Sequence, residues 1–384
     1  MSTFDVTALL TQASDDTGLT DFGDPSFHEG LEIYCASLNE EARLNELGGF
    51  ALQGNLHGVL TNRLRLIDWA ARHPEIGGEE VVAPVFVIGL FRAGTTLLSA
   101  LLDQDPANRS LLCWEAQDCT PPSSVTNHRA GERVEVQRLK LGMLEQLNPE
   151  LKAIHHEEPD GPTECITLMA QDFKALLWES VANVPTYGSW LMGTDQSSAY
   201  RHHKLALQVL QSGGVHGAWT LKSPHHALAL DALTAVYPDA KLVYLHRDPV
   251  EVAASAFSLM RCLSGTFTDA DHTDYITRRW TEVLVESVER VDDFRDRNPT
   301  QPIHDIAYLD FVANPIDTVR ELYGFLGREL EGMAEASMRG YLETNPQGRF
   351  GSHRYDVSDF GVEAGALRER FAPYQDRYGI PVVR

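Results

Sequence analysis

The sequence predicts an α/β fold in which a mainly parallel sheet of about four or five strands is flanked by helices on both faces. The first observation is a set of short apolar runs, such as Val-Phe-Val-Ile at 85–88, which are typical of strands buried on both faces. The second is that these runs are followed by segments with helical spacing, an alternation typical of parallel sheets. A third is helical spacing within residues 1–80, which predicts an N-terminal helical cap.

Length and charge limit the classes of function. A chain of 384 residues can bury a sizeable core, as one large α/β domain with an accessory part or as two domains. Its 55 acidic and 32 basic residues give a net charge of −23. A surface of this charge repels nucleic acid and anionic membranes, so we expect neither as a general partner. A polyanionic ligand can be held only where cations are gathered.

The sequence shows no sign of a membrane span or of export. It lacks a run of about 18 apolar residues, so we expect no transmembrane helix. Residues 1–16 lack the basic start and apolar core of a secretory signal. The five cysteines are odd in number, widely spaced and without a C-x-x-C pair. These features favour a cytoplasmic location with reduced thiols. The sequence does not specify an oligomeric state.

Residues 1–80 are expected to form a helical extension outside the sheet. Apolar residues recur near the helical period in segments 27–38, 40–47 and 56–71. We expect the extension to cover one side of the sheet, and a share in a ligand pocket is the alternative. Residues 77–80 form a plausible boundary, so the main domain is expected to span 81–384.

The turn after strand 85–88 predicts an anion-binding loop. The turn GLFRAG is followed by Thr95-Thr96 and a segment with helical spacing, whose first N–H groups have no intrahelical partners. The spacing is that of a phosphate-binding P-loop, but Thr95 replaces the motif's lysine, which argues against ATP or GTP hydrolysis. The loop's cation is Arg92, whose guanidinium suits a tetrahedral oxyanion. The alternative is a strand–turn–helix unit whose glycines serve packing alone.

A second motif follows strand 242–245. Arg247 comes after this strand, and Asp248-Pro249 predict the N-cap and first residue of a helix. Ser255 lies two helical turns beyond Asp248.

The R-x-G-T-T loop and the later R-D-P…S motif together resemble the PAPS-dependent sulfotransferases, in a bacterial-type branch. The resemblance covers roughly residues 80–380. It implies a P-loop-like domain that uses PAPS as donor, releases adenosine 3′,5′-bisphosphate and needs no metal. In the family the first loop holds the 5′-phosphosulfate, and the paired Arg and Ser hold the 3′-phosphate. The matching positions are Arg92, Ala93, Gly94, Thr95 and Thr96 for the first element, and Arg247 and Ser255 for the second.

The resemblance leaves two candidates for the base that takes the proton of the acceptor hydroxyl. Glu115 lies close to, though slightly beyond, the place of a glutamate in family members that act on protein tyrosine, lipids or sugars. His225 lies one residue from the place of a histidine in the phenol-type enzymes. Lys222, which closes predicted strand 218–221, matches a lysine that contacts the bridging oxygen or the sulfuryl group. We favour Glu115; the alternatives are a surface glutamate and a helix N-cap or core histidine.

Residues 127–216 are expected to be helical and, as the resemblance implies, to shape the acceptor pocket. Adjacent histidines at 155–156 and 202–203 point in different directions on a helix, so they lack the i, i+4 pairing of a helical metal site. We therefore expect no metal. The aromatic residues of this segment are either pocket walls or ordinary core: Phe173, Trp178, Tyr187, Trp190 and Tyr200.

The C-terminal third contains further elements of the fold. Segment 273–297 predicts a long helix, and 303–309 a strand. The residues from Tyr308 to Asn314-Pro315 resemble the family's Y-E-D-L-x-x-N-P element and lead into a helix expected to end at Gly327. Family members close the nucleotide site with a basic, glycine-bearing loop near the C-terminus, so Arg349 and Arg354 are the expected cations there.

The function implied is in-line transfer of a sulfuryl group from PAPS to a hydroxyl of a small molecule. The acidic surface argues mildly against highly sulfated glycans, which leaves a lipid, a phenol or another small alcohol. One alternative is a P-loop kinase or NTPase, disfavoured by Thr95 and by the absence of an obvious Mg²⁺-binding aspartate at the end of a strand. The other is a non-catalytic regulatory protein that binds the nucleotide.

Overall fold

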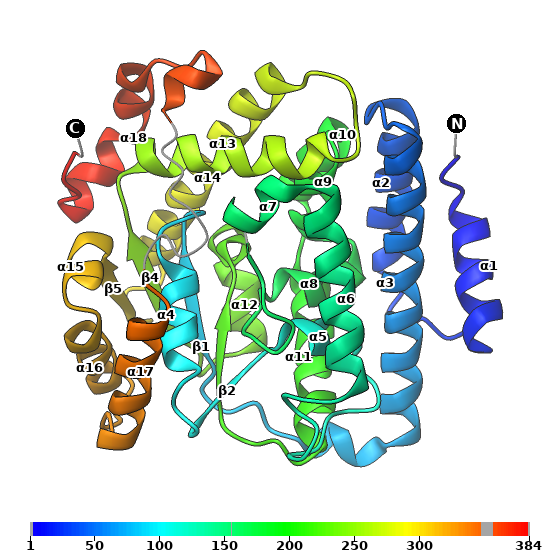
Figure 1. Ribbon diagram of the computed structural model, residues 1–384, viewed down its shortest axis with the longest axis horizontal. Helices are drawn as coiled ribbons and strands as arrows, with labels where there is room; N and C mark the ends of the chain where they lie inside the picture. Colours follow the sequence, from blue (N-terminus) through cyan, green and yellow to red (C-terminus); the bar gives the residue numbers. More distant parts are fainter. Residues whose placement is uncertain (1–2, 155, 347–355, 383–384) are drawn as a thin grey trace.

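A five-stranded sheet forms the centre of the molecule (Figure 1). The computed structural model describes residues 3–154, 156–346 and 356–382. Every neighbouring pair of strands is parallel, in the order β2-β3-β1-β4-β5. The predicted α/β class with a mainly parallel sheet is confirmed. The strands are β1 (Val85–Gly89), β2 (Asn108–Ser110), β3 (Ala218–Lys222), β4 (Lys241–His246) and β5 (Ile303–Ala307).

Four of the five strands lie where the sequence predicts them, and the fifth was not predicted. The predicted strand 303–309 ends early, at Ala307, because Tyr308 begins helix α15 (Tyr308–Ala313). The strand that the sequence did not predict is β2, whose three residues, Asn-Arg-Ser, contain no apolar side chain. An edge strand this short has no hydrophobic run from which it could be recognised.

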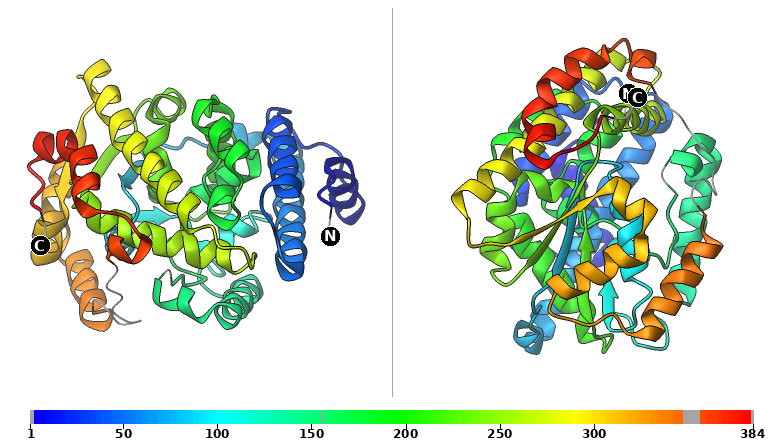
Figure 2. Two further views of the ribbon diagram at one scale, coloured as in Figure 1. Left: turned by 90° about the horizontal axis from the view of Figure 1, so that it is seen from above. Right: turned by 90° about the vertical axis from the view of Figure 1, so that its left-hand side faces the viewer.

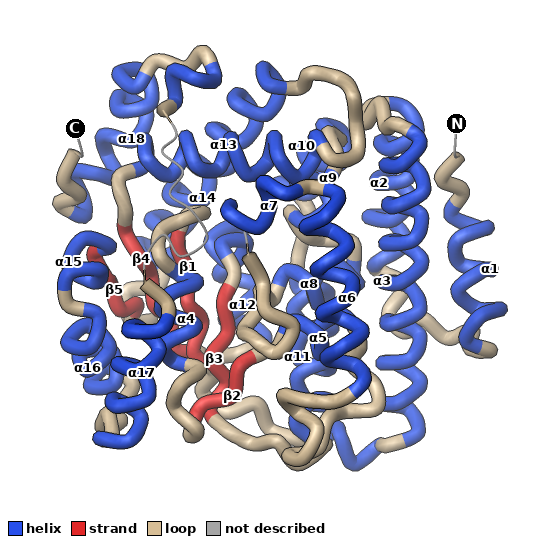
Figure 3. Tube along the Cα trace, in the orientation of Figure 1, coloured by secondary structure: helices blue, strands red, loops and turns tan. Residues whose placement is uncertain are grey.

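The strand order brings the ends of three strands together. β1 is central, and in its register Val87 lies opposite Lys222 of β3 and Val243 of β4. The chain runs outward from β1 to β2, returns to β3, and then crosses to β4 and β5 on the other side of β1 (Figure 3). In open parallel sheets, ligands bind outside the carboxyl ends of the strands where the strand order changes direction. This edge of the sheet is therefore where a site is expected.

Alternate residues of β1 enter two separate cores, which confirms that helices cover both faces of the sheet. Val85 and Val87 belong to a core with helices α4 (Thr95–Leu102) and α16 (Pro315–Phe325). Phe86 and Ile88 belong to the larger core on the opposite face. Figure 2 shows the two layers from the side. The long helices of the larger core include α11 (Ser197–Ser212), α13 (Pro249–Gly265) and α14 (Thr273–Arg297).

The N-terminal extension is helical and lies at one end of the molecule, where its buried side chains join the larger core (Figures 1 and 2). Its helices are α1 (Val6–Thr17), α2 (Phe27–Glu40) and α3 (Glu46–Arg72). α3 packs on α11, so the extension adds to the helical layer of this core instead of covering the sheet directly. The helix predicted at 40–47 is wrong, because the chain turns there: Arg43 has a φ of 50° and Leu44 bridges to Thr268.

The segment 127–216 is helical, as predicted. Its helices are α6 (Glu132–Leu147), α7 (Pro149–Ile154), α8 (Ile166–Met169), η2 (Ala170–Asp172), α9 (Leu177–Val181), α10 (Pro185–Gly193) and α11. The remaining elements are η1 (Pro74–Gly78), α5 (Cys113–Gln117), η3 (Pro224–Leu228), α12 (Leu230–Val236), α17 (Gly332–Thr344), η4 (Val357–Phe360) and α18 (Ala364–Tyr378). None of the helices in the described ranges is long and apolar enough to cross a bilayer.

Candidate active site at the carboxyl edge of the sheet

The loop between β1 and α4 is shaped as an anion cradle. Gly94 is the N-cap of α4 and has a φ of 98°, in the left-handed region that favours glycine. A Cβ atom at Gly94 would lie 2.9 Å from Cδ2 of Tyr308, so a larger residue would also clash. Arg92 adopts the same left-handed region, with a φ of 64°. The loop therefore directs the first N–H groups of α4 toward the edge of the sheet.

The five residues predicted to hold the 5′-phosphosulfate differ in accessibility. The side chains of Arg92 and Thr96 are exposed and line a cavity of about 530 Å³. Thr95 is buried, with 4% of its surface exposed. The N–H of Ala93 donates to the carbonyl of Leu90 at 3.1 Å, so this N–H is used within the turn. Of the five, Ala93 is thus the least suited to contact a ligand.

Arg247, at the end of β4, is joined directly to this loop. Its Nη1 donates to the carbonyl oxygen of Arg92 at 2.7 Å, and its Nε donates to Glu251 at 3.1 Å. The guanidinium also stacks on the ring of Tyr308, 4.2 Å from the ring centre. Ser255 is half-buried on α13, whose predicted N-cap is confirmed by a 2.9 Å hydrogen bond from the N–H of Val250 to Asp248.

Lys222 brings a third cation to the same edge from the end of β3. Its side chain is 3% exposed, and Nζ lies 2.9 Å from Oε1 of Glu164. Together with Arg92 it lines the 530 Å³ cavity. A second cavity, of about 270 Å³, is lined by Arg247 and Tyr308. The structure therefore brings together Arg92, Lys222 and Arg247, which lie far apart in the sequence.

Besides Arg92 and Lys222, the walls of the larger cavity combine polar and apolar groups and include a further cation, Arg129. They comprise one face of α4, the segment 156–162 and the end of α17, with carboxylates from Glu157, Glu158 and Asp160. This segment belongs to the insert that the resemblance assigns to the acceptor pocket. Tyr341, Ile154 and Pro162 give the cavity an apolar component.

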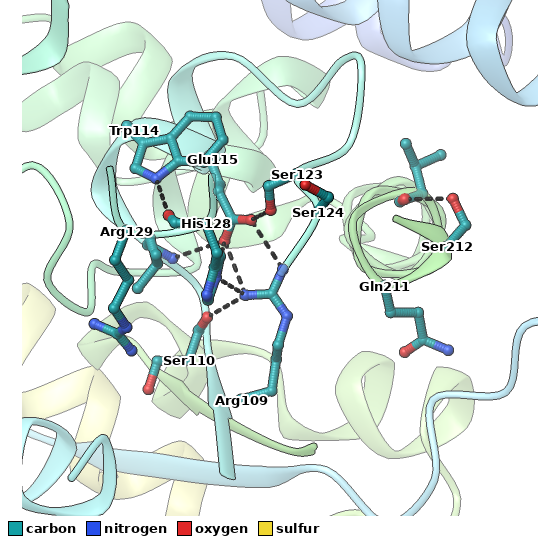
Figure 4. A network of polar contacts seen from close by, with 12 residues as sticks. Arg109, Ser110, Trp114, Glu115, Ser123, Ser124, His128, Arg129, Gln211 and Ser212 are labelled. Carbon is teal, nitrogen blue, oxygen red and sulfur yellow. Dashed lines mark hydrogen bonds and ion pairs between the residues drawn. The ribbon is translucent and has the colours of Figure 1, made fainter. Parts of the chain in front are cut away.

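Glu115 is not among the residues that line this cavity, and it lies in a buried network of polar contacts (Figure 4). Its side chain is fully buried and pairs with Arg109 of β2 through two hydrogen bonds, of 2.9 and 3.0 Å. The Ser123 hydroxyl donates to the same carboxylate at 2.7 Å, and His128 Nε2 lies 3.4 Å from it. Arg109 is equally enclosed, with 1% of its side chain exposed, and its guanidinium stacks on Trp219 at 4.6 Å.

The electrostatics of this network argue against Glu115 as the base. Burial alone would raise the pKa of Glu115, but the charge of Arg109 and the hydrogen bonds around the carboxylate lower it to about 2. A carboxylate with this pKa, without exposed surface, accepts a proton poorly at neutral pH. Neither predicted alternative describes it fully, because Glu115 is neither at the cavity nor on the surface.

His225 is a core histidine, which was the alternative stated for it. It is fully buried, and the Leu176 N–H donates to its Nδ1 at 3.4 Å. Nε2 therefore carries the proton and donates to Oε1 of Gln196 at 2.7 Å. Burial lowers the pKa of His225 to about 4. Both ring nitrogens are occupied by the core, which argues against a role as base.

Because buried histidines of this kind resist protonation, we expect the free energy of unfolding to fall below pH 6.5. Burial lowers the pKa of His203 to about 3 and that of His225 to about 4. Because the unfolded chain binds these protons near pH 6.5, each residue makes stability fall as pH drops from 6.5 toward 4, by up to about 1.4 kcal/mol per pH unit. Urea unfolding at pH 7 and pH 5 measures this, and His225→Gln should make the slope shallower. Equal stabilities at the two pH values would contradict the prediction.

Two predicted cations, Arg349 and Arg354, lie outside the described residues. Within the described ranges, no three His, Cys, Asp or Glu side chains are grouped as they would be around a metal ion. Sequence reasoning missed Glu164, the partner of Lys222, because no motif or periodicity marks it within the insert. The one sequence feature that could have drawn attention to Glu164 is its position between Pro162 and the apolar start of α8.

Comparison with known proteins agrees with the predicted family. The model of the Sulfotransferase family matches residues 84–332. The crystal structure of sulfotransferase STF9 from Mycobacterium avium superposes with a TM-score of 0.90 at 32% identity, over 99% of this chain and 98% of the other. Sulfotransferase STF1 from Mycobacterium tuberculosis H37Rv gives 0.86 at 28% identity, over 97% and 99%. Omega-hydroxy-beta-dihydromenaquinone-9 sulfotransferase Stf3 of Mycobacterium bovis is 22% identical, over 78% of this chain and 76% of its own.

Proposed function

Because this chain belongs to the sulfotransferase family, we propose that it transfers a sulfuryl group from PAPS to the hydroxyl of a small acceptor. The observation that carries the proposal is the meeting of Arg92, Lys222 and Arg247 at the anion cradle. In a protein with a net charge of −23, three cations at one edge of the sheet mark a site for a polyanion. The likeness to the mycobacterial enzymes extends over nearly the whole chain.

In the proposed reaction the acceptor oxygen attacks sulfur in line, and the bond from sulfur to the bridging oxygen breaks. The electron pair of that bond leaves with adenosine 3′,5′-bisphosphate. Arg92, Lys222 and the first N–H groups of α4 offset the charge that grows on the sulfuryl oxygens and on the leaving phosphate. These groups are held by β1, β3 and α4, so little reorganisation is needed during the transfer.

We assign the 5′-phosphosulfate to the cradle at Arg92, Gly94 and Thr96, and the 3′-phosphate to Arg247 and Ser255. The assignment is supported by the hydrogen bond from Arg247 to the Arg92 carbonyl, which holds the two elements together. The 270 Å³ cavity beside Arg247 offers room for part of the nucleotide. The larger cavity, with Arg92, Thr96 and Lys222 at one end, is then assigned to the acceptor.

For the acceptor we propose a lipid, a phenol or another small alcohol. The name of the Stf3 relative describes a hydroxylated menaquinone as its substrate, which favours the lipid class among these. A cavity of about 530 Å³ lies within the usual range for small-molecule sites. The proposal places the enzyme in the cytoplasm, where its five buried cysteines stay reduced.

The proposed function is tested by incubating the protein with PAPS labelled in its sulfuryl group and a panel of acceptors, followed by mass analysis. Suitable probes are 2-naphthol, farnesol and octyl glucoside, which represent a phenol, an isoprenoid alcohol and a sugar. Sulfated product is expected from at least one of them. Turnover of Mg²⁺-ATP would instead indicate a kinase or NTPase. Binding of the bisphosphate with no transfer to any acceptor would indicate a regulatory protein.

The Arg247→Ala variant should weaken binding of adenosine 3′,5′-bisphosphate far more than binding of AMP. The physical reason is that AMP lacks the 3′-phosphate with which the guanidinium would form charge-assisted hydrogen bonds. Isothermal titration calorimetry with both ligands measures the difference. Arg297→Ala serves as a control, since it removes an exposed arginine whose partner is Asp231 on α12. Equal losses for the two ligands would overturn the assignment of the 3′-phosphate.

A further inference from the structure

Proton transfer from the acceptor needs a group at the cationic end of the larger cavity. The two bases suggested by the sequence are enclosed elsewhere: Glu115 is paired with Arg109, and His225 with Gln196. The structure offers another carboxylate, Glu164, which does not itself line the cavity but lies 2.9 Å from the ammonium of Lys222, which does line it, beside Arg92.

The backbone around Glu164 is fixed to the ends of two strands. The N–H of Cys165 donates to the carbonyl of Lys222, the last residue of β3, at 2.9 Å. The N–H of Thr163 donates to the carbonyl of Leu111, directly after β2, at 2.8 Å. Glu164 lies between these two anchors. A side chain held from both sides in this way starts from a defined position, which a catalytic group requires.

Its side chain is partly exposed, which distinguishes it from the two earlier candidates. The Glu164 side chain is 19% exposed, whereas that of Glu115 is fully buried. Glu157, which lines the cavity, is a rival carboxylate, and it accepts a hydrogen bond from the Thr163 hydroxyl at 2.8 Å. Lys222 marks the position of the transferring group, and of the two carboxylates it is Glu164 that touches it.

We propose that Glu164 is the general base of the transfer, an inference that rests on the proposed function. Its carboxylate takes the proton of the acceptor hydroxyl as the new oxygen–sulfur bond forms. The bond from sulfur to the bridging oxygen breaks, and its electron pair leaves on the bisphosphate. Atoms and charge balance with no further reactant.

The ion pair with Lys222 connects nucleotide binding to the base. PAPS brings negative charge to the cradle, and the ammonium of Lys222 turns from Glu164 toward the bridging oxygen. A carboxylate that loses a neighbouring cation holds a proton more tightly. The same movement thus supplies the leaving group with a cation and makes Glu164 a better proton acceptor.

The test compares Glu164→Gln with the parent under single-turnover conditions, with labelled PAPS and the probes 2-naphthol, farnesol and octyl glucoside. Glutamine keeps an oxygen that accepts from Lys222 but cannot take a proton. The rate should fall about 10²–10⁴-fold, the usual contribution of a general base, while affinity for adenosine 3′,5′-bisphosphate stays within about threefold. Glu164→Ala should recover part of its rate when formate is added, because formate replaces the lost carboxylate.

Two further variants complete the design. Glu286→Gln, which breaks a Glu–Arg pair on α14 with Glu286 42% exposed, should retain the parent rate and controls for the loss of a charge. Glu157→Gln tests the rival. The inference is overturned if Glu164→Gln keeps the parent rate, if Glu157→Gln shows the loss instead, or if affinity for the bisphosphate falls as much as the rate. A parent protein that sulfates no probe would refute the proposed function itself, and the base assignment with it.

Discussion

Replacing Arg109 with methionine is expected to lower the free energy of unfolding by about 3–5 kcal/mol, the range found when one partner of a buried ion pair is removed. The reason is that Glu115 would be left as a fully buried charge without its cation. In the folded protein the charge of Arg109 and the hydrogen bonds around the carboxylate lower the pKa of Glu115, so the fold favours its ionised form. Urea unfolding at pH 7 measures the effect.

A double-mutant cycle distinguishes structure from catalysis in this network. The double variant Arg109→Met with Glu115→Leu should be less destabilised than Arg109→Met alone, because it leaves no unpaired charge. The stabilising contribution of Glu115 is present above pH 4.5 and is lost as pH falls from 4.5 toward 2. Glu115→Gln should therefore unfold more readily at pH 7, yet its folded fraction should keep most of its rate. Loss of rate with unchanged stability would restore Glu115 as the base.

Replacing Lys222 or Arg92 with alanine should lower kcat by about 10²–10³, the usual scale for removing one preorganised electrostatic partner of a transition state. Affinity for adenosine 3′,5′-bisphosphate should change less, because the sulfuryl group is absent from that product. Steady-state rates with labelled PAPS, combined with calorimetry, measure both quantities. Lys241→Ala is the matched control, since Lys241 is the first residue of β4 and lies at the amino end of the strands, opposite the proposed site.

Turnover that survives nearly intact in Lys222→Ala would show that the residue is structural. In that case its ion pair with Glu164 would serve only to join β3 to the insert, and unfolding measurements would show the loss instead.

Most of the sheet could be predicted because the three inner strands, β1, β3 and β4, have an apolar run that is followed by a turn or helix signal. The run of β1 is buried throughout, and the N-cap at Asp248 is a local feature of three residues. The turn at Arg43 could not be predicted, because it depends on the bridge between Leu44 and Thr268, which is set by tertiary packing. The apolar residues of 40–47 are compatible with a helix until that contact is known.

The site could be predicted only in part, for a similar reason. Arg92, Lys222 and Arg247 follow strands, and the carboxyl ends of parallel strands meet at one edge. The burial of Glu115 could not be predicted, because Glu115 pairs with Arg109 and Arg109 lies on β2, a strand without a hydrophobic run. The position of Glu164 could not be predicted either. It depends on hydrogen bonds from the neighbouring residues to β3 and to the residue after β2, and no spacing in the sequence reveals these bonds.

Under the proposed assignment of the nucleotide, the hydrogen bond from Arg247 to the Arg92 carbonyl would make the two ends of the nucleotide interdependent. A 3′-phosphate that drew the Arg247 guanidinium toward itself would change the restraint on the turn to which the sulfuryl end is assigned. Such coupling is reciprocal, so occupation of either end alters the affinity of the other by the same factor. A mononucleotide without a 3′-phosphate would consequently leave the hydrogen bond between Arg247 and the Arg92 turn unchanged. The protein would then discriminate among nucleotides in two ways: by how tightly it binds them and by how the Arg92 turn is positioned around the sulfuryl group.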